Sequence, residues 1–107
     1  MDEFYSSCAE SEPFALQVLG DSMEPEFIDG AVIIIDPAAP RVDGAFVFAT
    51  QGEEYIFRQL RMPADGPPYL TALNDAYPDL PLPGGLADVK GVIIRQTRRR
   101  RWKKIYD

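Results

Sequence analysis

Prolines and glycines are spread along the whole chain and keep every regular element short. Ten prolines and eight glycines occur among 107 residues, and proline lacks the backbone N–H that a helix interior requires. The sequence therefore predicts an all-β fold made of short strands. A length of 107 residues, with 46% hydrophobic composition, suits a single domain over residues 1–107.

Alternating and β-branched runs indicate where the strands lie. The loop at 50–53 contains Gly52 and predicts a hairpin between its flanking strands. Residues 31–35 form a continuous apolar run, which predicts a strand covered on both faces. Residues 62–68 and 74–87 are expected to be loops. The predicted strands are 14–19, 31–35, 45–49, 54–60, 69–73 and 91–95.

The lack of histidine excludes several kinds of catalytic or metal site. With no His and only Cys8, the chain offers no serine–histidine or cysteine–histidine pair, no zinc site of the usual ligands and no internal disulfide. The carboxylates among residues 21–29 match no known cation loop and are expected to form a solvated acidic turn. We therefore predict neither a metal nor a cofactor.

The longest apolar stretch, residues 31–35, is far too short to cross a membrane, and the N-terminus is acidic where a secretory signal is basic. These features predict a cytoplasmic protein that makes no membrane contact.

Charge is divided unevenly between the two halves of the chain. Residues 1–54 hold twelve acidic residues and one base, a net charge of −11, whereas residues 55–107 hold ten bases and five acids, a net charge of +5. A basic tail at 95–104 can bind nucleic acid through its cations and an aromatic ring. The alternatives are a solvated basic terminus and a tail that docks on the acidic half of its own or a partner subunit. The residues expected to make these contacts are Arg98, Arg99, Arg100, Arg101, Trp102, Lys103 and Lys104.

Residues 19–30 contain the one pattern that predicts chemistry. They read Leu-Gly-Asp-Ser-Met-Glu-Pro-Glu-Phe-Ile-Asp-Gly, directly before the apolar run. This order resembles the nucleophile region of the S24 peptidases, which include the LexA and UmuD proteases and phage repressor C-terminal domains and share a fold with signal peptidases. Residues 53–60 resemble the second catalytic strand of that family, and residues 91–95 resemble its closing strand.

A serine hydroxyl becomes a nucleophile only when a tight turn exposes it, a base takes its proton and donors face the oxyanion. The resemblance implies Ser22 as the nucleophile. From the position of the turn, the backbone N–H of Ser22 or of Met23 is expected to serve as an oxyanion donor, and Met23 is the candidate site residue for this role. The resemblance also implies a binding groove near the turn. The alternative is an ordinary turn in which Asp21 and Ser22 cap a helix. The expected groove residues are Gly20, Asp21, Pro25, Asp29 and Gly30.

The resemblance also implies a lysine as general base, and here the sequence departs from the family. Alignment of the second strand puts Arg58 at that position, and no lysine precedes Lys90. A guanidinium stays protonated and only donates hydrogen bonds, so it does not deprotonate a serine. We expect Arg58 to bond a carboxylate or carbonyl beside the turn, with Asp21 as the first candidate, unless it is an ordinary surface arginine.

These observations favour a non-cleaving S24 domain that acts as a dimerisation or regulatory module of the repressor type. The family cleaves a small residue–glycine bond in itself, and this chain contains no Ala-Gly or Cys-Gly pair. The resemblance implies a homodimer, a repressor subunit or a RecA-type filament as partner, and a role in transcription regulation or the SOS response. Two alternatives stay open: an active serine peptidase with an unidentified base, and a nucleic-acid-binding module.

Overall fold

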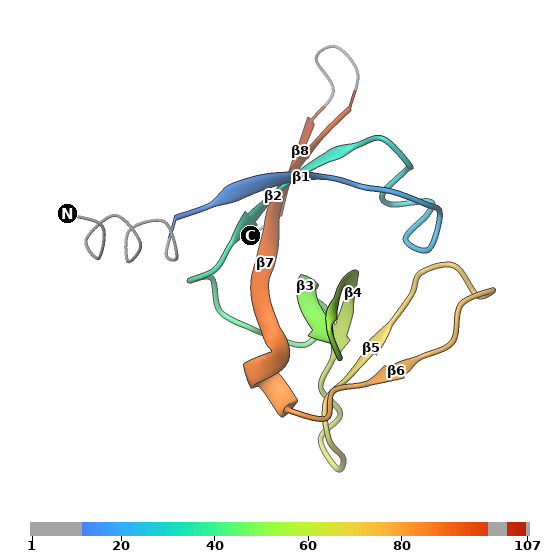
Figure 1. Cartoon of the computed structure of the whole chain (residues 1–107), viewed down its shortest axis with the longest axis vertical. Coiled ribbons are helices and arrows are strands. Elements are labelled where there is room, and N and C mark those ends of the chain that lie inside the picture. The colour runs from blue at the N-terminus through green and yellow to red at the C-terminus, as the bar shows by residue number, and fades with distance from the viewer. Residues whose placement is uncertain (1–11, 99–102, 107) are drawn as a thin grey trace.

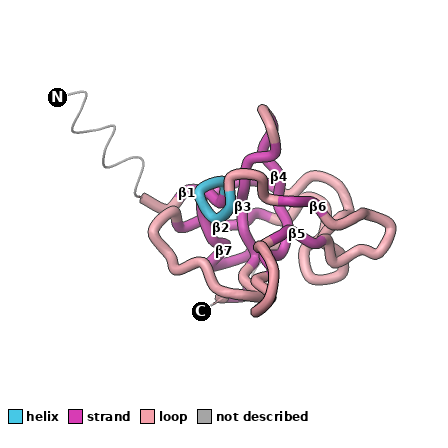
Figure 2. The backbone as a smooth tube through the Cα atoms, turned by 90° about the horizontal axis from the view of Figure 1, so that it is seen from below, coloured by secondary structure: helices cyan, strands magenta, loops and turns pink. Residues whose placement is uncertain are grey.

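A computed structural model describes residues 12–98 and 103–106, and it confirms the all-β prediction. Figure 1 shows one antiparallel sheet that curls on itself, with the long strand β7 running through its middle. Regular helix in the described residues is limited to one short 3-10 turn (Figure 2). The elements are β1 Phe14–Gln17, β2 Val32–Asp36, β3 Phe46–Gln51, β4 Glu54–Arg61, β5 Tyr69–Thr71, β6 Leu80–Pro81, η1 Gly85–Asp88, β7 Val89–Thr97 and β8 Lys103–Ile105.

The strands follow the order β1-β2-β7-β3-β4-β5-β6, and β8 pairs with β7 beyond the end of β3. All of these pairs are antiparallel. Only the β3–β4 hairpin is closed by a two-residue turn, in which Gly52 has a φ of +64° that suits glycine. This confirms the predicted hairpin, with a tighter turn than the expected 50–53 loop.

The two faces of the curled sheet carry separate apolar clusters, because alternate residues of a strand point to opposite faces. In β3, Phe46 and Phe48 pack on the first cluster, whereas Val47 and Ala49 belong to the second. The first cluster includes Ile33, Ile35 and Ile93 with two residues from the β1–β2 loop, Met23 and Phe27. The second consists of Val47, Ala49, Leu60, Leu70, Leu82, Val89 and Val92.

Three strand predictions need correction. The run at 31–35 is not covered on both faces, because Val32 lies on the outer side of β2 with 37% of its surface exposed. The first strand ends at Gln17, because the chain leaves the sheet there to form the β1–β2 loop. The expected loop at 74–87 contains β6, which pairs with β5, and most of η1.

Candidate functional site

The loop between β1 and β2 presents Ser22 and is closed at its base by backbone contacts. The N–H of Gly20 donates to Asp29 Oδ1 at 2.6 Å, and the N–H of Gly30 donates to the Val18 carbonyl at 2.8 Å. Gly20 and Gly30 have φ values of +92° and +93°, a backbone conformation in which other residues are strained. The predicted residues Gly20, Asp29 and Gly30 therefore shape the loop itself.

Two apolar side chains of the same loop fix it to the core. Met23 and Phe27 are fully buried in the first cluster, and the Phe27 N–H donates to the Met23 carbonyl at 2.9 Å. The Phe27 ring meets the rings of Phe46 and Phe57 edge-on, with centroid distances of 4.9 and 4.8 Å. Burial of this pair holds the intervening loop against the sheet.

Ser22 and Arg58 meet although 36 residues separate them. Arg58 extends from β4, and its Nη1 donates to Ser22 Oγ at 3.0 Å and to the Phe57 carbonyl at 2.9 Å. Both residues line a groove of about 250 Å³. Burial lowers the pKa of Arg58, partly offset by its interaction with Tyr77, and a guanidinium stays charged even so.

The structure corrects the expected partner of Arg58, which is Ser22 itself rather than Asp21. The Asp21 carboxylate instead accepts a hydrogen bond from the Tyr77 hydroxyl at 2.6 Å. The Tyr77 ring lies under the Arg58 guanidinium, 5.5 Å from its carbon. The hydrogen bond between Tyr77 and Asp21 is the largest cause that raises the pKa of Tyr77, and the negative charge of Asp21 is the second.

The segment after β5 supports the Ser22 turn from the other side. Asn74 donates from its side chain to the Asp21 carbonyl at 3.1 Å, and its backbone N–H donates to the Ser22 carbonyl at 3.0 Å. Asn74 and Tyr77 were both missed by sequence reasoning, which treated their segment as loop. No local pattern indicates such contacts, because they depend on how two distant loops meet.

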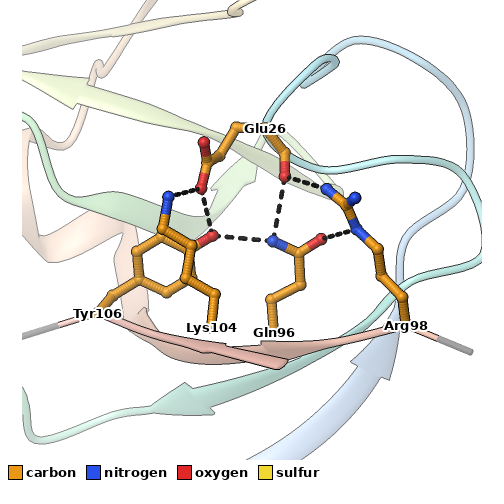
Figure 3. Close-up of polar contacts among 5 residues, drawn as sticks. All are labelled: Glu26, Gln96, Arg98, Lys104 and Tyr106. Atoms are coloured by element: carbon orange, nitrogen blue, oxygen red, sulfur yellow. Dashed lines mark hydrogen bonds and ion pairs between the residues drawn. The ribbon is translucent and has the colours of Figure 1, made fainter. Parts of the chain in front are cut away.

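Glu26 joins the same loop to the carboxyl-terminal strands, as Figure 3 shows. Its carboxylate accepts from Lys104 Nζ at 2.6 Å and from the Tyr106 hydroxyl at 2.7 Å. Its backbone carbonyl accepts from Gln96 at 3.1 Å and from Arg98 at 2.9 Å. These five residues, Glu26, Gln96, Arg98, Lys104 and Tyr106, are called the Glu26 cluster below.

The Glu26 cluster sets the protonation of its members. Burial alone would raise the pKa of Glu26, but the hydrogen bonds from Lys104 and Tyr106 and the charges of Lys104 and Arg98 lower it below its usual value. Burial, followed by the bond to Glu26, raises the pKa of Tyr106 far above its usual value. At neutral pH the Glu26 carboxylate is therefore anionic, and it accepts hydrogen bonds from the Lys104 ammonium group and from the neutral hydroxyl of Tyr106.

The expected solvated acidic turn is thus only partly correct. Asp21 and Glu26 each accept a hydrogen bond from another part of the chain, and Asp29 accepts one from Gly20 of the same loop. Among the residues that the structure describes, no group of three or more potential ligands is placed to hold a metal ion.

The basic tail is described only in part. Lys104 and Arg98 contact Glu26 of the same chain, in agreement with a tail that docks on the acidic half. Lys103 lies exposed on β8. Arg99, Arg100, Arg101 and Trp102, together with Cys8, lie outside the described residues.

Comparison with known proteins shows the family of this chain. Residues 3–94 match the family model described as Peptidase S24-like. This chain belongs to the S24-like family. The fold described above is consistent with that membership.

Known relatives in this family are repressors and regulators. The chain is 40% identical, over 91 residues, to the HTH-type transcriptional regulator for conjugative element SXT of Vibrio cholerae, covering 78% of this chain. It is 36% identical over 85 residues, again 78% of this chain, to the LexA repressor of Verrucomicrobium spinosum. Over 92 residues, 84% of this chain, it is 33% identical to the prophage repressor CohE of Escherichia coli.

The matches extend over only part of those relatives. The chain spans 41% of the length of each. In the part of the chain described by the structure, no helix is long and apolar enough to span a membrane.

Proposed function

We propose that this S24-like domain is catalytically degenerate and acts as a dimerisation and regulatory module of the repressor type. The observation that carries the proposal is the 3.0 Å hydrogen bond from Arg58 Nη1 to Ser22 Oγ. The family resemblance aligns Arg58 with the lysine that serves as general base. In this reading Ser22 keeps the place of the nucleophile but has lost its proton acceptor.

The chemistry of the two side chains explains the loss. A lysine in a partly buried site can give up its proton and then accept one from serine. A guanidinium keeps its proton at any physiological pH and has no lone pair to offer. By donating to Ser22 Oγ, Arg58 holds the hydroxyl in place but cannot accept its proton.

The described lysines offer no evident replacement for the missing base. Lys90 is exposed and donates to the Ala87 carbonyl, and Lys104 pairs with Glu26. Lys103 is exposed on β8, and none of the three lines the groove that contains Ser22. This favours the degenerate domain over an active peptidase.

Labelling with a serine-reactive fluorophosphonate, measured by intact-mass spectrometry at neutral and alkaline pH, tests the proposal. We expect no adduct on the wild type and an adduct on Arg58→Lys, because the shorter amine can deprotonate beside the same serine. Arg61→Lys is the matched control, since Arg61 lies on the same strand and pairs with Asp43 instead. Adding Ser22→Ala to Arg58→Lys should abolish the adduct.

A Ser22 adduct on the wild type would contradict the proposal and put the active peptidase first. An Arg58→Lys variant that folds but stays unlabelled would show that the rest of the site is not built for catalysis.

The partners follow from the same proposal. The named relatives are regulators and repressors, and this supports a role in transcription regulation through a homodimer or a repressor subunit. Association with a RecA-type filament, a link to the SOS response and a cytoplasmic location remain predictions from the resemblance. Binding of nucleic acid through the tail has no specific support among the described residues.

A further inference from the structure

The Arg58 guanidinium is charged, partly buried and without a carboxylate. The ion pairs of the described chain join Arg61 to Asp43 and Lys104 to Glu26, and neither involves Arg58. Asp21, the partner expected from the sequence, accepts a hydrogen bond from Tyr77 instead. Burial has removed part of the hydration of this cation, and no carboxylate of the described chain compensates for that loss. Binding of an anionic group would therefore stabilise it.

The hydrogen-bond inventory of this guanidinium leaves donors unused. Of its five N–H groups, the two on Nη1 point to Ser22 Oγ and the Phe57 carbonyl. Nε is buried with no acceptor, and Nη2 donates to no group in the described chain. The Ser22 hydroxyl, which accepts from Nη1, keeps its own proton to donate. The backbone N–H groups of Ser22 and Met23 likewise have no acceptor among the described residues.

Apart from Gln17, the rest of the groove is lined by aliphatic and aromatic residues. Its lining includes Leu16, Ile33 and Phe48, and two strongly exposed side chains, Leu19 and Tyr55. Leu19 is 81% exposed and Tyr55 is 64% exposed, so these side chains are available to a ligand. Apolar walls beside a cluster of donors fit a ligand with one anionic group and an apolar body.

The groove is also lined by residues of two strands, β1 and β4, that leave part of an edge unpaired within the described chain. β1 is the edge strand of the sheet, and residues 54–58 of β4 pair only with β3, because β5 pairs with residues 59–61 alone. Residues 16–19 and 55–58 all line this groove. An extended peptide can therefore form backbone hydrogen bonds along it.

We propose that this groove binds the carboxyl end of an extended apolar peptide, with the terminal carboxylate on Arg58 and the Ser22 hydroxyl. The inference rests on the proposed function in one respect, namely that Arg58 acts as a fixed cation and not as a base. Both N–H groups of Nη1 are already used and Nε is buried, so the carboxylate would accept from the N–H groups of Nη2 and from the Ser22 hydroxyl. Hydrogen bonds between oppositely charged groups are stronger than those between neutral groups. Where other members of the family cleave a peptide bond, this site would bind the carboxyl end of a peptide without cleaving it.

The test compares two peptides that differ in charge alone. The full chain, labelled with 15N, is titrated with N-acetyl-Leu-Val-Leu-Ala bearing a free carboxylate and with its C-terminal amide, and NMR follows the Ser22 and Met23 amides and Arg58 Nε–H. We expect the acid to bind at least about tenfold more tightly than the amide, as for a lost charged hydrogen bond. Arg58→Gln should erase that preference, whereas the matched control Arg61→Gln should keep it.

Three results would overturn the inference: equal binding of acid and amide, no shift at millimolar acid, or acetate binding as tightly as the peptide. The acid–amide comparison on the wild type stands even if Arg58→Gln fails to fold. Failure of the proposed function has a different signature, because an active Ser22 would take the fluorophosphonate label whether or not the peptide binds.

Discussion

Gln96 illustrates how one buried polar residue organises the site from a distance. Its side chain is fully buried in β7, and its amide donates to the Glu26 carbonyl and to the Tyr106 hydroxyl at 2.8 Å. Its own oxygen accepts from Arg98 Nε at 3.1 Å. Burying an amide side chain costs free energy unless its N–H and C=O groups form hydrogen bonds. The buried Gln96 side chain therefore favours the one arrangement in which Glu26, Arg98 and Tyr106 can supply them.

Replacing Gln96 with Leu should destabilise the domain by about 1–3 kcal/mol, because the shape is nearly kept while buried groups lose their partners. The measurement is the free energy of unfolding in urea. Gln17→Leu is the control, since that side chain is exposed on the edge strand β1, and its effect should stay within about 0.5 kcal/mol. An equally small effect of Gln96→Leu would mean that water replaces the lost contacts.

At the scale of elements, the β1–β2 loop depends on one strand from the middle of the chain and one from its C-terminal part. β4 supplies Arg58, which contacts Ser22, and β8 supplies Lys104, which contacts Glu26. Close packing inside the sheet sets where these strands lie. A Cβ at Gly91 of β7 would overlap the Ile35 side chain of β2, so glycine is required there for the two strands to approach.

The attachment of β8 to the loop should weaken in acid. The pKa of Glu26 is lowered in the folded protein, so its stabilising contribution is present above the unfolded value of about 4.5 and is lost as the pH falls through the lower folded value. The free energy of unfolding of the wild type should exceed that of Glu26→Gln at pH 7, and the difference should shrink toward pH 3.

Glu24→Gln controls for the change in net charge, because Glu24 lies in the same loop and forms no ion pair in the described chain. A wild-type advantage over Glu26→Gln that stayed constant down to pH 3 would contradict the assignment of this acid sensitivity to the Glu26 cluster.

At the scale of the whole molecule, a second groove lies beside β8. It has a volume of about 590 Å³ and is lined mainly by apolar residues that include Val42, Ile94 and Ile105. Val42 is 55% exposed and Ile105 is 62% exposed. This surface includes the late strands through which the resemblance implies that the domain dimerises.

Ile105→Glu should therefore shift the proposed homodimer toward the monomer, because a charge would have to be buried in an apolar contact. Sedimentation equilibrium over a range of protein concentrations measures the effect, expected as at least about a tenfold rise in the dimer dissociation constant. Leu86→Glu, on η1 and away from this groove, should not change it. A wild type that is monomeric throughout would refute the dimer.

The sequence predicts the strands well but the site only in part. Proline spacing and alternation locate the hairpin around Gly52, because a two-residue turn is a local property. The resemblance aligns Arg58 with the general base, but the expected partner is Asp21, and no spacing in one chain shows that Arg58 bonds Ser22, 36 positions away. Tyr77 and Gln96 escaped prediction because their partners are set by tertiary packing, and glutamine in a strand usually faces water.

The Glu26 cluster also bears on the order in which parts of the domain fold during synthesis. The bond between Tyr106 and Glu26 spans 80 residues of sequence, so the Ser22 loop leaves the ribosome long before its last supporting strand exists. Contacts of such long range form late, because chain entropy must be overcome first. A nascent chain stalled before β8 would therefore present the serine turn without its final support, and the groove would mature only once synthesis has passed residue 106.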